Sequence, residues 1–203
     1  MLHHVLIPAL GILAGIISIS AYPPYIRDML KGTTKPERAS WLIWSALALI
    51  ALTSQLAAGA HWSIYMTLAQ TVGVIVIFIL SLKYGYGGLK KRDIISIIIA
   101  ALGVAGWLIT NSPLFALLCV VAVDAAGAWL TVYKAFKDPG SETLITWELD
   151  SLSNLLGLLA VGTFSFSLVL YPAYLLVANG AVVVAILIAR QNIKSKKLNT
   201  IKS

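Results

Sequence analysis

The sequence predicts an all-α integral membrane protein with seven transmembrane helices, and three observations support this fold class. Of the 203 residues, 59% are hydrophobic and only 11% are charged, whereas a soluble domain carries about 25% charged residues. Seven apolar runs follow one another, each near the roughly 20 residues that cross a bilayer. The Lys and Arg residues gather between these runs on one side. A soluble enzyme, a disordered chain and a nucleic-acid-binding domain are therefore excluded.

The apolar runs define the expected helices in chain order. A β-barrel is not expected, because a run such as Ile75–Leu80 does not alternate polar and apolar residues. Helices satisfy their backbone polar groups within the segment, as the bilayer interior requires. The expected spans are Val5–Tyr25, Ala39–Ala58, Ser63–Leu82, Asp93–Asn111, Leu114–Tyr133, Leu144–Val161 and Leu168–Ile188.

All fifteen basic residues fall on one side of a seven-span chain. By the positive-inside rule, this places the C-terminus in the cytoplasm and the N-terminus outside a plasma (inner) membrane. It also explains the net charge of +7 without any nucleic acid. The four basic segments are Arg27, Lys31, Lys35 and Arg38; Lys83, Lys90, Lys91 and Arg92; Lys134 and Lys137; and Arg190, Lys194, Lys196, Lys197 and Lys202.

The chain also contains a weak internal repeat. When the first three spans are shifted by 106 positions, Lys31 meets Lys137, Ser40-Trp41 meets Thr146-Trp147, and Tyr65 meets Tyr171. This predicts two three-helix bundles joined by a linker helix, a 3+1+3 plan. The extra crossing gives both bundles the same orientation, as in transporters built from parallel repeats. The predicted parts are residues 1–83, 84–111 (inner loop and linker), 112–190, and a basic tail at 191–203.

Two stretches carry a family resemblance. Tyr22-Pro23-Pro24-Tyr25-Ile26, followed by Lys31-Gly32-Thr33-Thr34, resembles the PQ-loop motif of the SWEET/SemiSWEET (MtN3-like) transporters. The chain looks like a divergent member, since the PQ dipeptide reads Pro-Pro. The resemblance implies a carrier that alternates access between two bundles and moves a sugar-like or other small solute. It also implies that Asn179 matches a pocket asparagine of the family, with Gln70 as an approximate counterpart.

Polar residues within the spans are the candidate site. Asp124 lies near the middle of its span, where a carboxylate costs at least ~2.5–3.5 kcal/mol, so it is expected either to bind substrate or couple protons or to hold helices together. Asp150 and Asn154 share a helical face with Trp147, by i, i+3 and i+7 spacing. The predicted substrate-binding set is Trp44, Gln70, Asp124, Asp150, Asn154 and Asn179. Gln70 and Asn179 have helix–helix hydrogen bonding as their alternative role.

Two prolines are the hinge candidates. Pro23 and Pro24 fall late in the first span, where a proline removes one helical hydrogen bond and kinks the helix. They are expected either to form the flexing point of a moving bundle or simply to end the first helix.

These features together predict a transporter that moves a small polar solute by alternating access, with possible coupling to protons. No enzymatic activity, cofactor, metal or nucleic-acid partner is expected. The expected partners are the solute and the lipid bilayer, for a monomer or homo-oligomer. Two alternatives are a nicotinamide-riboside-type vitamin carrier and a non-transporting membrane receptor or assembly protein on the same scaffold. A retinal protein is disfavoured because the run Leu168–Ile188 contains no lysine for a Schiff base.

Overall fold

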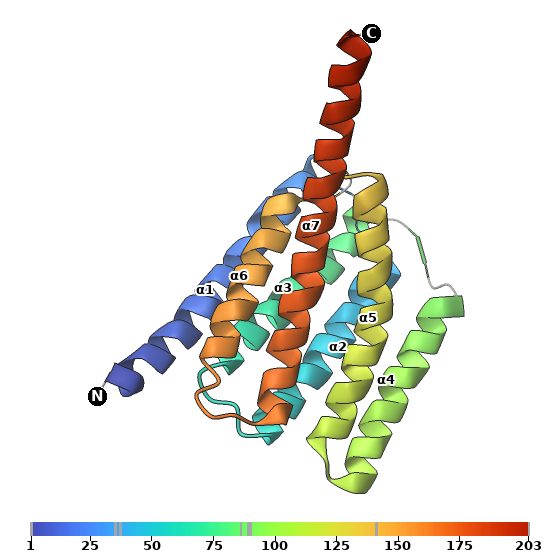
Figure 1. The fold of residues 1–203 in the computed structure, drawn as a ribbon. Coiled ribbons are helices and arrows are strands. Elements are labelled where there is room, and N and C mark those ends of the chain that lie inside the picture. Colours follow the sequence, from blue (N-terminus) through green and yellow to red (C-terminus); the bar gives the residue numbers. More distant parts are fainter. Residues whose placement is uncertain are drawn as a thin grey trace.

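The computed structural model describes residues 2–34, 36, 38–85, 87–88, 91–140 and 142–202. Within these residues the chain is helical and has no β-strand (Figure 1). Five helices are long and apolar enough to cross a membrane, which confirms an all-α fold of the multi-pass membrane class. The helices are α1 (Leu2–Leu30), α2 (Arg38–Ala57), α3 (Ile64–Tyr84), α4 (Lys91–Thr110), α5 (Pro113–Lys137), α6 (Leu144–Leu159) and α7 (Phe166–Lys202).

The helix boundaries differ from the predicted spans in three places. The fully apolar part of α4 is short, Ala101–Thr110, and α6 has 16 residues. At a rise of 1.5 Å per residue, α6 is about 24 Å long, somewhat less than the roughly 30 Å hydrocarbon core. At the C-terminus, α7 continues to Lys202, so the predicted basic tail is helical as far as the structure describes it.

The first helix passes through its prolines without ending. Pro8, Pro23 and Pro24 all lie inside α1, which continues to Leu30. The interpretation of Pro23 and Pro24 as helix terminators is therefore wrong. The helix survives the loss of three backbone donors because α3 and α6 pack along it and supply tertiary stabilisation. The hinge role of the two prolines stays a prediction.

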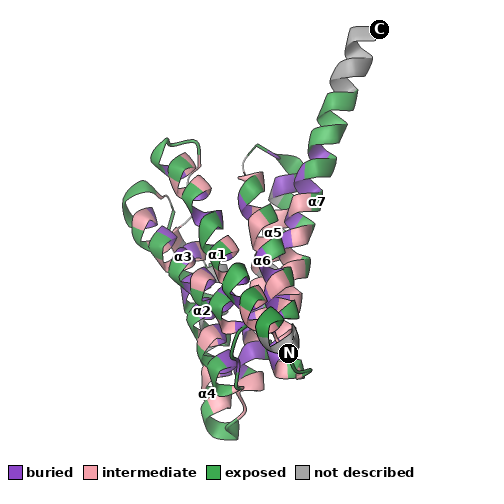
Figure 2. Cartoon of the chain, turned by 90° about the vertical axis from the view of Figure 1, so that its left-hand side faces the viewer, coloured by how far each residue is buried: buried purple, intermediate pink, exposed green. Residues whose placement is uncertain are grey.

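The helices on either side of α4 pack in the same order. In the first group α1 and α2 each contact α3, and in the second group α5 and α6 each contact α7. Across the groups, α1 packs against α6 and α2 packs against α5 (Figure 1). Helix α4 packs mainly on α5. Buried residues lie between the helices, and exposed ones follow their outer faces (Figure 2).

The two contacts between the groups differ in chemistry. The α2–α5 contact is apolar and is built from Ile43, Leu47, Ala51, Leu117, Val120 and Val123, with Tyr171 of α7. The α1–α6 contact contains directed hydrogen bonds. Thr146 Oγ1 donates to the Ala21 carbonyl at 3.1 Å, and Ser153 Oγ donates to the Ala14 carbonyl at 2.8 Å. At the C-terminal end of α1, Thr143 Oγ1 donates to Asp28 Oδ2 at 3.3 Å.

Candidate functional site

A group of buried polar side chains lies where α1, α3 and α6 meet. Gln70 Nε2 of α3 donates to Asn154 Oδ1 of α6 at 3.3 Å, and Asn154 Nδ2 donates to the Asp150 carbonyl at 2.6 Å. Tyr22 of α1 donates its hydroxyl to the Gln70 carbonyl at 3.2 Å. Three of the predicted residues, Gln70, Asp150 and Asn154, are thus brought together. We call this group, with Ser18 and Tyr22, the polar cluster.

Burial makes this cluster energetically unusual. Gln70 is 8% exposed, and Ser18 and Asn154 are fully buried. Three buried atoms of the cluster, Ser18 Oγ, Gln70 Oε1 and Asp150 Oδ1, have no hydrogen-bond partner. A buried polar atom without a partner costs about 1–3 kcal/mol. The cluster therefore holds hydrogen-bonding capacity that the described part of the chain does not use.

A glycine on α3 sets the position of Tyr22. A Cβ atom at Gly73 would lie 2.1 Å from Cε2 and 2.2 Å from Cζ of the Tyr22 ring. Only a residue without a side chain allows this ring to lie against α3 and its hydroxyl to reach Gln70. Sequence reasoning missed Tyr22 and Gly73 as site residues. The available signal was the polar hydroxyl of Tyr22 inside the Tyr22–Ile26 stretch.

Asp124 belongs to a different helix contact. Its Oδ2 atom accepts a hydrogen bond of 2.6 Å from the Tyr174 hydroxyl of α7. Tyr171, one turn earlier on α7, is close enough to Asp124 for an electrostatic interaction. The structure thus places Asp150 at the contact of α1, α3 and α6 and Asp124 at the contact of α5 and α7. Tyr22, which is close to Asp150, is also close to Tyr171.

The remaining predicted residues lie at the edge of these groups. Trp44 meets Trp41 edge to face at a centroid distance of 5.2 Å and packs against the aromatic cluster of Tyr22, Tyr25 and Trp41. Asn179 is buried in α7, and its side chain forms no hydrogen bond with any other described residue. Trp147 donates an Nε1–H hydrogen bond to Glu142 Oε2 at 3.2 Å, near the N-terminal end of α6.

Replacing Tyr174 with Phe is expected to destabilise the protein. Phenylalanine keeps the ring but leaves Asp124 Oδ2 without its 2.6 Å donor, at a cost of about 1–3 kcal/mol. Thermal unfolding in detergent, followed by tryptophan fluorescence, measures the loss. Tyr133→Phe is the control. Tyr133 lies on α5, the same helix as Asp124, but it is 57% exposed. Equal melting temperatures for Tyr174→Phe and the parent protein would contradict a stabilising role for this bond.

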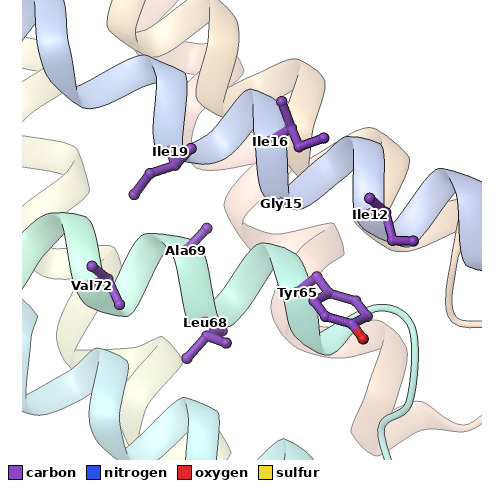
Figure 3. A pocket seen from close by; sticks show the side chains of 8 residues that line it. All are labelled: Ile12, Gly15, Ile16, Ile19, Tyr65, Leu68, Ala69 and Val72. Atoms are coloured by element: carbon purple, nitrogen blue, oxygen red, sulfur yellow. The ribbon is translucent and has the colours of Figure 1, made fainter.

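An apolar groove lies elsewhere, on the outer side of α1 and α3. It has a volume of about 450 Å³, and Figure 3 shows its apolar walls. Ile16 is 58% exposed beside it, so the groove faces outward and holds none of the predicted site residues. Its lining is Ile12, Gly15, Ile16, Ile19, Tyr65, Leu68, Ala69 and Val72.

Among the described residues, no three His, Cys, Asp or Glu side chains gather as a metal site requires.

Comparisons with known proteins add no relative. No protein-family model matches the chain, and neither the curated proteins nor the solved structures contain a match. The functional interpretation therefore depends on the residues themselves.

Proposed function

We propose that the chain is a membrane carrier that moves a small polar solute by alternating access. The observation that carries this proposal is the polar cluster, which has three buried atoms without a partner, Ser18 Oγ, Gln70 Oε1 and Asp150 Oδ1. Buried polar groups are normally satisfied, and unsatisfied ones mark functional positions. Polar and ionisable groups inside a membrane protein mark substrate pathways for the same reason.

The packing order supports a carrier with two moving parts. In each three-helix group the first and second helices pack on the third, and the groups meet through α1–α6 and α2–α5. This repeated order is what a 3+1+3 duplication with parallel halves predicts, and such carriers bind solute between their halves. In this proposal, the N-terminus is outside and the C-terminus is cytoplasmic, since the basic residues follow the inner ends of the helices.

Solute uptake into liposomes tests the proposal. The purified protein is reconstituted, and uptake is measured for a panel of labelled sugars, amino acids, vitamins and amines. We expect at least one of these to accumulate above the level in protein-free liposomes. Gln70→Leu removes an amide of the polar cluster and is expected to reduce this uptake about tenfold, equivalent to about 1.4 kcal/mol.

The matched control is Thr53→Val. Thr53 also lies within a span, but it is exposed and its Oγ1 donates only to carbonyls of its own helix, those of Leu49 and Ile50. This variant is expected to keep full uptake. If nothing in the panel accumulates, the carrier proposal fails, and a receptor or assembly protein on this scaffold takes its place. If Gln70→Leu transports normally, the polar cluster is not the solute site.

A further inference from the structure

Three donor groups of the polar cluster already form hydrogen bonds within the protein. Tyr22 donates its hydroxyl to the Gln70 carbonyl, Gln70 donates Nε2 to Asn154 Oδ1, and Asn154 donates Nδ2 to the Asp150 carbonyl. The last bond fixes the orientation of both amides. A backbone carbonyl only accepts, so Asn154 must direct its nitrogen toward it and its oxygen toward Gln70. Gln70 must then direct its nitrogen toward Asn154, which leaves its oxygen unpartnered.

What remains in the cluster is capacity to accept. The buried atoms without a partner are Ser18 Oγ, Gln70 Oε1 and Asp150 Oδ1. An amide oxygen and an ionised carboxylate oxygen accept hydrogen bonds and donate none, and a serine hydroxyl can accept as well. A ligand with several hydrogen-bond donors can therefore satisfy all three atoms.

The helix register brings these atoms to one level. Ser153 donates to the carbonyl of Ala14, and Thr146 donates to that of Ala21. A step of seven residues forward along α1 therefore corresponds to a step of seven residues backward along α6. Ser18, four residues beyond Ala14, is thus level with residue 149, beside Asp150. Gln70 reaches the same part of α6 through Asn154, one turn from Asp150. The three acceptors come from three helices that pack against one another, α1, α3 and α6.

An ionised Asp150 has no cationic partner among the described residues. The sequence contains no Lys, Arg or His from Val5 to Ile26, from Ile64 to Leu82, or from Leu144 to Leu159, which cover most of α1 and α3 and all of α6. A buried carboxylate without a partner is strongly unfavourable. A cationic ligand supplies the missing charge.

We infer that the polar cluster is a site for a small organic cation, whose ammonium group donates to Asp150 Oδ1, Gln70 Oε1 and Ser18 Oγ. A primary ammonium has three N–H donors, one for each acceptor. The Tyr22 ring lies beside the site and can contribute a cation–π contact. This inference rests on the proposed function, because it names the class of solute that the carrier takes.

Four small probes of similar size test the inference. They are ethanolamine (a primary ammonium), choline (a quaternary ammonium without N–H donors), ethylene glycol (neutral) and glycolate (an anion), at equal ionic strength. A ligand that binds only the folded state raises the melting temperature. We expect ethanolamine to stabilise the purified protein most, choline to do so less, and the neutral and anionic probes to have no effect.

Three variants connect the shift to named atoms. Asp150→Asn removes the charge and is expected to abolish the ethanolamine shift. Ser18→Ala removes one acceptor with little change in volume and is expected to weaken ethanolamine binding about tenfold, or about 1.4 kcal/mol, so the test holds even if Asp150→Asn does not fold. Glu148→Gln is the control, since Glu148 is an exposed acid on the same helix. It is expected to bind ethanolamine as the parent protein does.

The outcomes separate this inference from the proposed function. An equal shift with ethylene glycol or glycolate, an unchanged ethanolamine shift in both Asp150→Asn and Ser18→Ala, or no shift with either amine overturns the cation site. Uptake of a neutral solute into liposomes would then leave the carrier proposal standing. Binding of ethanolamine without uptake of any cation would instead keep the cation site and overturn the carrier.

Discussion

Cross-linking the C-terminal end of α1 to the N-terminal end of α6 is expected to stop solute uptake. Thr143, which directly precedes α6, donates its hydroxyl to Asp28 Oδ2 of α1 at 3.3 Å, so the two side chains face each other. Cysteines at positions 28 and 143, in a Cys119→Ala background, are joined by a short reagent that contains a cleavable disulfide. Alternating access requires this contact to open. We expect uptake to fall at least about tenfold, as when a gating motion is blocked.

Reversal and single-site controls make the cross-linking result specific. Reduction of the reagent's disulfide should restore uptake, and each single-cysteine variant treated with the reagent should keep it. Peptide mass spectrometry shows what fraction of the protein is cross-linked. Full uptake by fully cross-linked protein would mean that α1 and α6 do not separate at this end during transport.

Placing a methyl group at Gly73 is expected to be among the most destabilising single substitutions in the spans. The Cβ of Gly73→Ala would fall 2.1 Å from the buried Tyr22 ring, and the ring cannot stay where it is. Overpacking of this kind costs about 1–3 kcal/mol. Displacing the ring also breaks the bond from Tyr22 to the Gln70 carbonyl. We expect a lower melting temperature together with weaker solute binding.

Gly180→Ala is the matched control for this substitution. Gly180 is also inside a spanning helix, but a Cβ atom there meets nothing within 4 Å. Alanine favours a helix over glycine by about 1 kcal/mol, so this variant should be as stable as the parent protein or more so. Combining Gly73→Ala with Tyr22→Leu should recover part of the lost stability. Similar losses for Gly73→Ala and Gly180→Ala would show that the Tyr22 contact is not the cause.

The sequence predicted the helices well because bilayer thickness sets their length. Apolar runs and the basic segments between them located all seven helices to within a few residues at most ends. It could not predict that α1 continues past Pro23 and Pro24, since proline propensity favours a break and only packing by neighbouring helices overrides it. The helical continuation of α7 to Lys202 was missed because hydropathy reports the membrane boundary and not the helix end.

The candidate site was predictable along each helix but not between helices. Asp150 and Asn154 were placed on one face by their spacing, and the bond from Asn154 Nδ2 to the Asp150 carbonyl is consistent with it. The separation of Asp124 from Asp150 depends on which helices pack together, which spacing within a span does not encode. The level of Ser18 beside α6 follows only from the interhelical bonds at Ala14 and Ala21, which the sequence does not encode.

The extension of α7 to Lys202 means that a small tilt of this helix produces a larger displacement at its C-terminal end. Residues 190–202 continue the helix beyond the other six (Figure 1), a rod of about 20 Å at 1.5 Å per residue. A rigid rod converts rotation at its base into translation at its tip, so a tilt of about 10° in α7 moves the tip by about 3–4 Å. A spin label near Lys194 would therefore report small rotations of α7 that are hard to detect within the bilayer.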